Sequence, residues 1–144
     1  MARILLVDDE TEPVEELVSG LRKQGHHVVH EPNISAAQKA IAGADRYDVA
    51  IVDIMVPILM RRESAAISCM TAEREVRESE RGGVQFYRML KQHYPDVKII
   101  IHSVYDKDEI EKRNPKVTLD CPVVQKETIP TTILNAVQRA LSDQ

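Results

Sequence analysis

The sequence predicts one α/β domain, in which helices cover both faces of a five-stranded parallel sheet. Two observations support this fold class. Short runs rich in valine and isoleucine, typical of strands buried on both faces, alternate with segments of helical periodicity. Such alternation gives parallel strands joined by helices, and 144 residues are enough for one domain with a proper core. We therefore expect a single domain over residues 1–144 with a long insertion at 58–82.

The first half of the chain alternates predicted strands and helices. In order, these are a strand at 4–7, a helix that ends at Gly25, a strand at 27–30, a helix capped by Asn33 or Ser35, and a strand that ends at Asp53. The strand at 27–30 is polar at both ends, as is typical of a sheet edge. The strand before Asp53 is a continuous apolar run, and Pro57 ends the regular structure.

The second half repeats the alternation after the insertion. In order, it contains a helix opened by Gly83 and closed by Pro95, a strand at 97–103, a short charged helix at 106–113, a strand at 121–124 and a helix through Leu141. Pro122 lies within the last predicted strand and indicates a sheet edge. The whole pattern favours a flavodoxin-like doubly wound sheet with the strand order 2-1-3-4-5.

The insertion at 58–82 has an apolar first part and a charged second part. Glu73 and Arg77 are four residues apart, as are Arg74 and Glu78, and this spacing stabilises helices. The second part is therefore expected to extend the following helix backward. The insertion is interpreted either as a lid or docking element beside Asp53 or as a solvated loop.

Four of the five predicted strands have polar side chains at or just beyond their carboxyl ends: Asp8 and Asp9, Asp53, Ser103, and Lys126. A single aspartate in such a place usually caps a turn, but in the order 2-1-3-4-5 these four ends share the edge where ligands bind. Three carboxylates brought together need a cation, and a few hard oxygen ligands favour Mg²⁺. Lys126 and Ser103 can hold phosphoryl oxygens, and Asp53 can act as a nucleophile that forms an acyl phosphate.

These residues make the sequence similar to the receiver domain of two-component response regulators over nearly its whole length. The matching residues are Leu6-Val7-Asp8-Asp9-Glu10, Asp53-Ile54-Met55-Val56-Pro57, Gly83, Ser103 and Lys126. The resemblance implies that Asp53 accepts a phosphoryl group from a phosphohistidine. It also implies that Asp9, Asp53 and the backbone carbonyl of Met55 bind Mg²⁺ with help from Asp8. Ser103 and Lys126 would hold the phosphoryl oxygens.

The resemblance implies a signalling switch that is not an enzyme beyond its own phosphorylation and dephosphorylation. Its expected partners are a sensor histidine kinase or phosphotransfer protein and a downstream protein target. In the family, the helix at 106–113, the last strand and the last helix present the change to partners. One alternative is a receiver-like interaction scaffold that does not depend on phosphorylation. A Mg²⁺-dependent phosphohydrolase is disfavoured, since Met55 stands where such enzymes usually carry an acid/base carboxylate.

The sequence departs from the receiver pattern in the residues that normally transmit the signal. Val123 stands where many receivers carry an aromatic that rotates when the hydroxyl moves, so the output is expected to take another path or to be weak. Glu127 replaces a common proline after Lys126. We predict a trans bond between them, because a cis bond before a residue other than proline costs about 2.5–4 kcal/mol.

A further departure is apolar bulk beside Asp53, from Met55, Val104 and Tyr105. Such bulk obstructs attack by water, so we predict slow autodephosphorylation, which a phosphoryl half-life of only seconds would contradict. The alternative is that these side chains simply cover the edge of the core.

Composition sets limits on location and partners. The net charge of −4 argues against nucleic-acid binding, and no run of residues is long enough to span a membrane. Cys69 and Cys121 lack metal or redox spacing, which favours a reduced, cytoplasmic setting. A zinc site at the histidines at 26, 27 and 30 is disfavoured because no carboxylate or cysteine partner is evident. His102 is interpreted as a hydrogen-bonded core residue.

Overall fold

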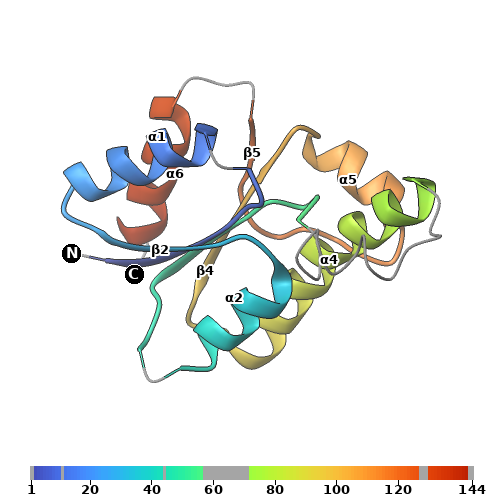
Figure 1. Cartoon of the computed structure of the whole chain (residues 1–144), viewed down its shortest axis with the longest axis horizontal. Coiled ribbons are helices and arrows are strands. Elements are labelled where there is room, and N and C mark those ends of the chain that lie inside the picture. The colour runs from blue at the N-terminus through green and yellow to red at the C-terminus, as the bar shows by residue number, and fades with distance from the viewer. Residues whose placement is uncertain (1, 11, 44, 57–71, 127–129, 143–144) are drawn as a thin grey trace.

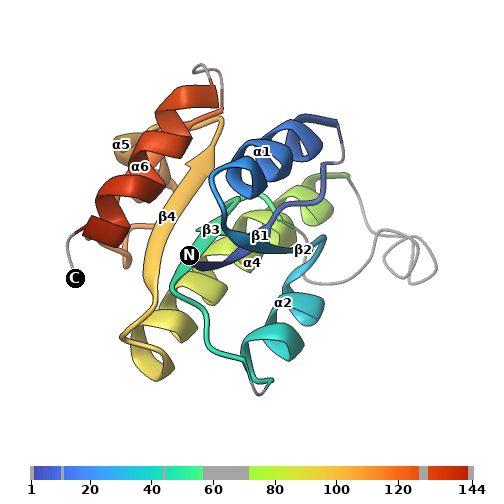
Figure 2. The ribbon, with the colours of Figure 1, turned by 90° about the vertical axis from the view of Figure 1, so that its left-hand side faces the viewer.

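The structure is a computed structural model that describes residues 2–10, 12–43, 45–56, 72–126 and 130–142. Its five strands form one parallel sheet in the order β2-β1-β3-β4-β5. Helices α1 and α6 cover one face of the sheet, and α2, α4 and α5 cover the other (Figure 1, Figure 2). The predicted flavodoxin-like fold and strand order are confirmed.

The elements alternate as expected from the sequence. In chain order they are β1 (Arg3–Val7), α1 (Glu12–Lys23), β2 (His27–Glu31), α2 (Ile34–Ile41), β3 (Val49–Val52), α4 (Ala72–His93), β4 (Lys98–Ser103), α5 (Lys107–Arg113), β5 (Val123–Gln125) and α6 (Pro130–Ser142). Among the described residues, no helix has the length and apolar character needed to cross a membrane.

The central strands are buried on both faces, which explains their continuous apolar runs. Leu5 and Val7 of β1 pack toward α2 and α4, whereas Ile4 and Leu6 pack toward α1 and α6. All four side chains are fully buried. Successive strand residues point to opposite faces, so the residues from Ile4 to Val7 enter the two cores in alternation.

Two predicted helix ends are confirmed by their hydrogen bonds. Gly25 has a φ of 91°, and the N–H groups of Gly25 and His26 donate to the carbonyls of Arg22 and Leu21 after α1. This is the pattern of a Schellman motif, whose left-handed residue favours glycine. Of the two candidate caps of α2, Asn33 is the one used, and its side chain accepts from the N–H of Ala36 at 2.8 Å.

The predicted start of the helix after the insertion is wrong. We placed it at Gly83, but α4 begins at Ala72, so the charged second part of the predicted insertion is helical. The expected backward extension is thereby confirmed, and its residues favour helices apart from Gly82 and Gly83. The preceding residues, 57–71, lie outside the described part of the chain, so the first part of the insertion that we interpreted as a lid or docking element is not described.

The boundary of the last strand also differs from the prediction. β5 starts at Val123, so Pro122 precedes the strand rather than lying within it. The Pro122 carbonyl still accepts a hydrogen bond from the N–H of Ile101 at 2.9 Å. Proline can accept in this way but cannot donate to a ladder. Among the described strands β5 pairs with β4 alone, so its predicted edge position is confirmed.

Candidate functional site

The register of β1 and β3 brings the acidic residues together. Val7 pairs with Val52, and the next residues of the two strands are Asp8 and Asp53. The N–H of Asp53 donates to the carbonyl of Val7 at 2.9 Å, which holds this register up to the strand ends. Carboxylate oxygens of Asp8, Asp9 and Asp53 all lie within 4.8 Å of one another.

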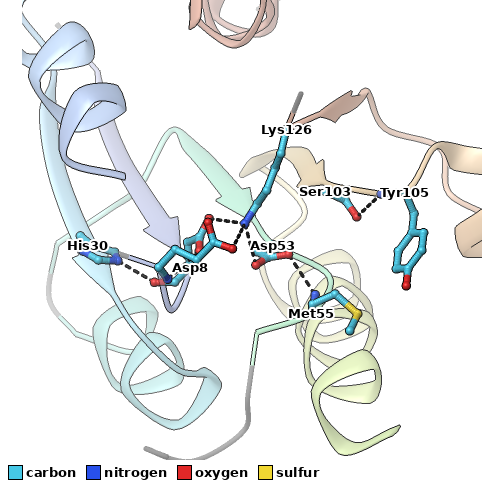
Figure 3. A network of polar contacts seen from close by, with 8 residues as sticks. Asp8, His30, Asp53, Met55, Ser103, Tyr105 and Lys126 are labelled. Atoms are coloured by element: carbon cyan, nitrogen blue, oxygen red, sulfur yellow. Dashed lines mark hydrogen bonds and ion pairs between the residues drawn. The ribbon is translucent and has the colours of Figure 1, made fainter. Parts of the chain in front are cut away.

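Lys126 follows the edge strand β5, and its side chain reaches this acidic cluster from there. Its backbone N–H donates to the carbonyl of Ser103 at 2.7 Å, so β4 fixes the point at which the side chain leaves β5. Its Nζ lies 2.9 Å from Asp8 Oδ2 and 3.0 Å from Asp53 Oδ2, between the two carboxylates (Figure 3). Glu10 Oε1 is 3.7 Å from the same nitrogen.

Burial governs the charge state of this cluster. The Asp53 side chain is only 4% exposed, and burial, assisted by the charge of Asp8, raises the pKa of Asp53 to about 6. Lys126 and the N–H of Met55, which donates to Asp53 Oδ1 at 3.0 Å, act in the opposite direction. Burial by itself would lower the pKa of Lys126, but Asp53 and Asp8 raise it above its usual value. One ammonium therefore only partly compensates the buried carboxylates.

Ser103 contributes a hydroxyl to the same edge of the sheet. It is the last residue of β4 and fully buried, and its Oγ accepts a hydrogen bond from the N–H of Tyr105 at 3.1 Å. The Tyr105 ring extends away from the carboxylates (Figure 3). The guanidinium of Arg113, at the end of α5, lies 4.2 Å from the centre of that ring.

The donor atoms suit a hard divalent cation. In the part of the chain that the structure describes, Asp8, Asp9 and Asp53 are the one group of acidic, histidine or cysteine side chains arranged to hold a metal. Carboxylate oxygens are the ligands that Mg²⁺ prefers, and the raised pKa of Asp53 indicates that more positive charge would be accommodated. For Met55 the structure gives the amide contact with Asp53, and a role for its carbonyl stays a prediction.

All the predicted side chains thus converge at one edge of the sheet. Sequence reasoning did not predict the contacts of three further residues there. Glu10 lies beside Lys126, His30 contacts the Asp8 carbonyl, and Gly83 passes close to Ile54. Glu10 was noted only as a match to the receiver pattern, and Gly83 as such a match and as the start of a helix. The position of His30 on an edge strand gave no signal.

The apolar residues beside the site divide into two groups. Met55, Tyr105 and Val123 are half-buried and pack against the core, as the second interpretation of the apolar bulk expects. Val104, by contrast, is 49% exposed. The rate of autodephosphorylation stays a prediction. The bond after Lys126 lies outside the described residues.

Two of the histidines set aside in the sequence, His26 and His102, differ in the hydrogen bonds of their Nδ1 atoms. Nδ1 of His26 accepts a hydrogen bond from the N–H of Ala2 at 3.2 Å. The hydrogen bond expected for His102 is not found at Nδ1, which is buried without a partner in the described part of the chain. Burial, helped by the charge of Lys126, lowers the pKa of His102 to about 4, so its ring is neutral at pH 7.

Solved receiver domains share this architecture. A CheY-like response regulator receiver domain protein from Methanospirillum hungatei is 18% identical, with a TM-score of 0.72 and coverage of 99% of this chain and 95% of that one. The BeF3-activated receiver domain of Klebsiella pneumoniae RstA is 21% identical, with a TM-score of 0.70 and coverage of 96% and 97%. Thermotoga maritima TrrA, solved with Mg²⁺ and beryllofluoride, is 23% identical, with a TM-score of 0.67 and coverage of 97% and 99%.

Comparisons of sequence alone give no match. No protein-family model matches the chain, and no curated protein matches it. The likeness lies in three-dimensional structure, where it extends over nearly every residue. The chain therefore has the fold of the response regulator receiver domains.

Proposed function

We propose that this chain is a phosphoaccepting receiver that takes a phosphoryl group onto Asp53 and signals through protein partners. The observation that carries the proposal is the convergence of five chemically matched side chains at one edge of a receiver-like sheet: Asp8, Asp9, Asp53, Ser103 and Lys126. The donor would be a phosphohistidine of a sensor histidine kinase or of a phosphotransfer protein. The expected setting is cytoplasmic.

The chemistry is a transfer between two side chains. An oxygen of the Asp53 carboxylate forms a bond to phosphorus while the bond from phosphorus to the histidine nitrogen breaks, and the electron pair leaves with the imidazole. With a pKa of about 6, Asp53 is largely ionised at pH 7 and able to attack. Lys126 faces the same carboxylate and supplies positive charge for the phosphoryl oxygens.

Asp8, Asp9 and Asp53 would hold the Mg²⁺, which when bound supplies charge neutralisation for the phosphoryl group. This assignment is supported by the oxygen donors of the cluster and by TrrA, which was solved with Mg²⁺ and beryllofluoride. Since the chain transfers a phosphoryl group to itself and then loses it, we do not class it as an enzyme.

The signal would follow from the new charge at Asp53. Phosphorylation adds roughly −1.5 to −2 charges and three strong acceptors. Ser103 is the hydroxyl able to donate to them, and its movement would change the contact with Tyr105 that leads to α5. The partner contacted there would be a protein, because the net charge of −4 does not suit nucleic acid.

A second candidate, a receiver-like scaffold independent of phosphorylation, is favoured by one observation. Val123 of β5 packs against the core, so the aromatic ring that many receivers turn in response to phosphorylation is replaced by a smaller side chain. The receiver requires the carboxylate of Asp53 as phosphoacceptor, whereas the scaffold does not.

Beryllofluoride with Mg²⁺ mimics the phosphoryl group and separates the candidates. We expect the wild-type chain to bind it tightly, and Asp53→Asn, which keeps the size of the side chain but removes its charge, to lose binding. Asp45→Asn, on the exposed Asp45, should bind like the wild type. An absence of binding by the wild type would support the scaffold, whereas steady turnover of a phosphate ester would support the phosphohydrolase.

A further inference from the structure

The side chain of His30 reaches the loop that holds two of the three acids. His30 lies on β2, and its Nε2 is 2.6 Å from the backbone carbonyl oxygen of Asp8 (Figure 3). A carbonyl oxygen can only accept, so Nε2 carries the proton and donates it.

β2 thereby holds Asp8 by both of its backbone groups. The N–H of Asp8 donates to the carbonyl of Glu31 at 3.1 Å, and the carbonyl of Asp8 accepts from His30. Glu31 is the last residue of β2, so the backbone pairing of β1 with β2 ends there. The His30 side chain extends the contact between the two strands to the carbonyl of Asp8, one residue beyond β1. The carbonyl to which His30 donates belongs to the peptide plane joining Asp8 to Asp9.

The orientation of that peptide plane affects the whole acidic cluster. Rotation of the plane changes the direction in which the chain leaves Asp8, and it would move the Asp9 carboxylate relative to Asp53. The Asp8 side chain is itself tied by the N–H of Glu10, which donates to Asp8 Oδ1 at 2.9 Å. Residues that orient metal ligands through hydrogen bonds commonly affect metal affinity without touching the metal.

We infer that His30 is a positioning residue for the divalent cation site, which it preorganises by fixing the peptide between Asp8 and Asp9. This inference rests on the proposed function, because the three carboxylates are assigned there as the Mg²⁺ ligands. It assigns to the edge strand β2 a role in the site through the backbone of Asp8.

The test measures Mg²⁺ affinity directly, by titrating the full chain with magnesium chloride and following the amide resonances of Asp9 and Asp53. His30→Leu removes the donor while keeping apolar bulk, and the groove beside residue 30 contains Val14 and Val18 to pack against it. We expect the dissociation constant for Mg²⁺ to rise roughly 10-fold. His30→Gln, whose amide nitrogen lies at a similar reach, should restore affinity to within about threefold of the wild type.

Two further variants exclude a general loss of structure. His27→Leu changes the exposed histidine at the start of the same strand and should leave Mg²⁺ affinity unchanged. His30→Asn keeps an amide but is too short to reach the Asp8 carbonyl, so it should bind Mg²⁺ as weakly as His30→Leu. If the leucine variant fails to fold, the comparison of glutamine with asparagine decides. Urea unfolding without Mg²⁺ reports any purely structural contribution separately.

The inference is overturned if the wild type binds Mg²⁺ and His30→Leu binds it equally well. It is also overturned if His30→Gln is as weak as His30→Leu, because the hydrogen bond would then not be the cause. Failure of the wild type itself to bind Mg²⁺ would overturn the assigned metal site, and this inference with it.

Discussion

At the scale of single residues, Gly83 determines how closely α4 can pass the loop after Asp53. A Cβ atom at this position would lie 2.5 Å from the Cα and the carbonyl oxygen of Ile54. Backbone atoms cannot turn away as a flexible side chain can. Gly83→Ala should therefore push α4 from the site and lower the free energy of unfolding by about 1–3 kcal/mol, measured by urea denaturation.

A second helical glycine provides the control for this prediction. A Cβ on Gly20 of α1 would lie 3.4 Å from Leu134 Cδ1, an ordinary contact with a movable side chain. Gly20→Ala should thus be neutral or stabilise the protein by roughly 0.5–1 kcal/mol, because glycine is unfavourable within a helix. Equal effects of the two substitutions would contradict the proposed clash at Gly83.

His102 should make stability depend on pH. Burial and Lys126 lower its pKa from 6.5 to about 4 in the folded state, so between these values the unfolded chain binds more protons. Stability is then fully present above pH 6.5 and falls as the pH drops toward 4. Between pH 7 and pH 5 the free energy of unfolding, measured by urea denaturation, should change differently in the wild type and in His102→Gln. Relative to the variant, the wild type should lose about 2 kcal/mol over this interval.

Comparing the pH profiles of the wild type and His102→Gln separates the effect of His102 from that of Asp53, which titrates in the same range. The pKa of Asp53 is raised in the folded state, so its protonation has the opposite sign and is common to both proteins. Identical pH profiles would show that His102 does not stay neutral in the fold.

At the scale of elements, α5 is connected to the site through Tyr105. The backbone of Tyr105 donates to Ser103 Oγ, and its ring lies under the guanidinium of Arg113. The capping box of Asp106 and Glu109 fixes the start of the same helix. A displacement of the Ser103 hydroxyl would thus reach α5 without the aromatic ring that Val123 replaces.

Tyr105→Ala should separate binding from output. We expect the variant to bind Mg²⁺ and beryllofluoride, but the changes that they cause in the α5 amide resonances should shrink to less than about half, since the cation–π contact is lost. Val104→Ala, which truncates an exposed neighbour, should respond like the wild type. Full shifts in Tyr105→Ala would mean that the signal reaches α5 by another route.

At the scale of the whole molecule, the proposed Mg²⁺ site in the acidic cluster should link cation binding to stability. A ligand that binds only the folded state stabilises it by about 2.7 kcal/mol at 100 times its dissociation constant. Mg²⁺ should therefore raise the Tm of the wild type in a concentration-dependent way, as calorimetry would detect.

A substitution in the cluster should remove this effect. Asp9→Asn, at a half-buried residue that we propose as a ligand, is expected to abolish most of the rise in Tm, whereas Asp96→Asn, on the exposed Asp96 after α4, should retain it. A rise of equal size in the Asp9 variant would place the Mg²⁺ elsewhere.

The sequence by itself determined the alternation of strands and helices, the edge strands and the residues at the strand ends. Those features follow from local chemistry: buried strands need continuous apolar runs, glycine ends α1 at Gly25, and Asn33 caps α2. In a parallel sheet the carboxyl ends meet at one edge, so the strand order alone placed Asp8, Asp53 and Lys126 together.

Only the tertiary structure decided how these side chains meet. Lys126 bridges Asp8 and Asp53, His30 grips the Asp8 carbonyl, and α4 passes so close to Ile54 that its residue there must be glycine. Each contact joins residues far apart in the chain, and its geometry depends on register and on the packing between layers. Hydrophobic periodicity and turn residues do not reveal register or the packing between layers, because these sequence patterns reflect only a few neighbouring residues.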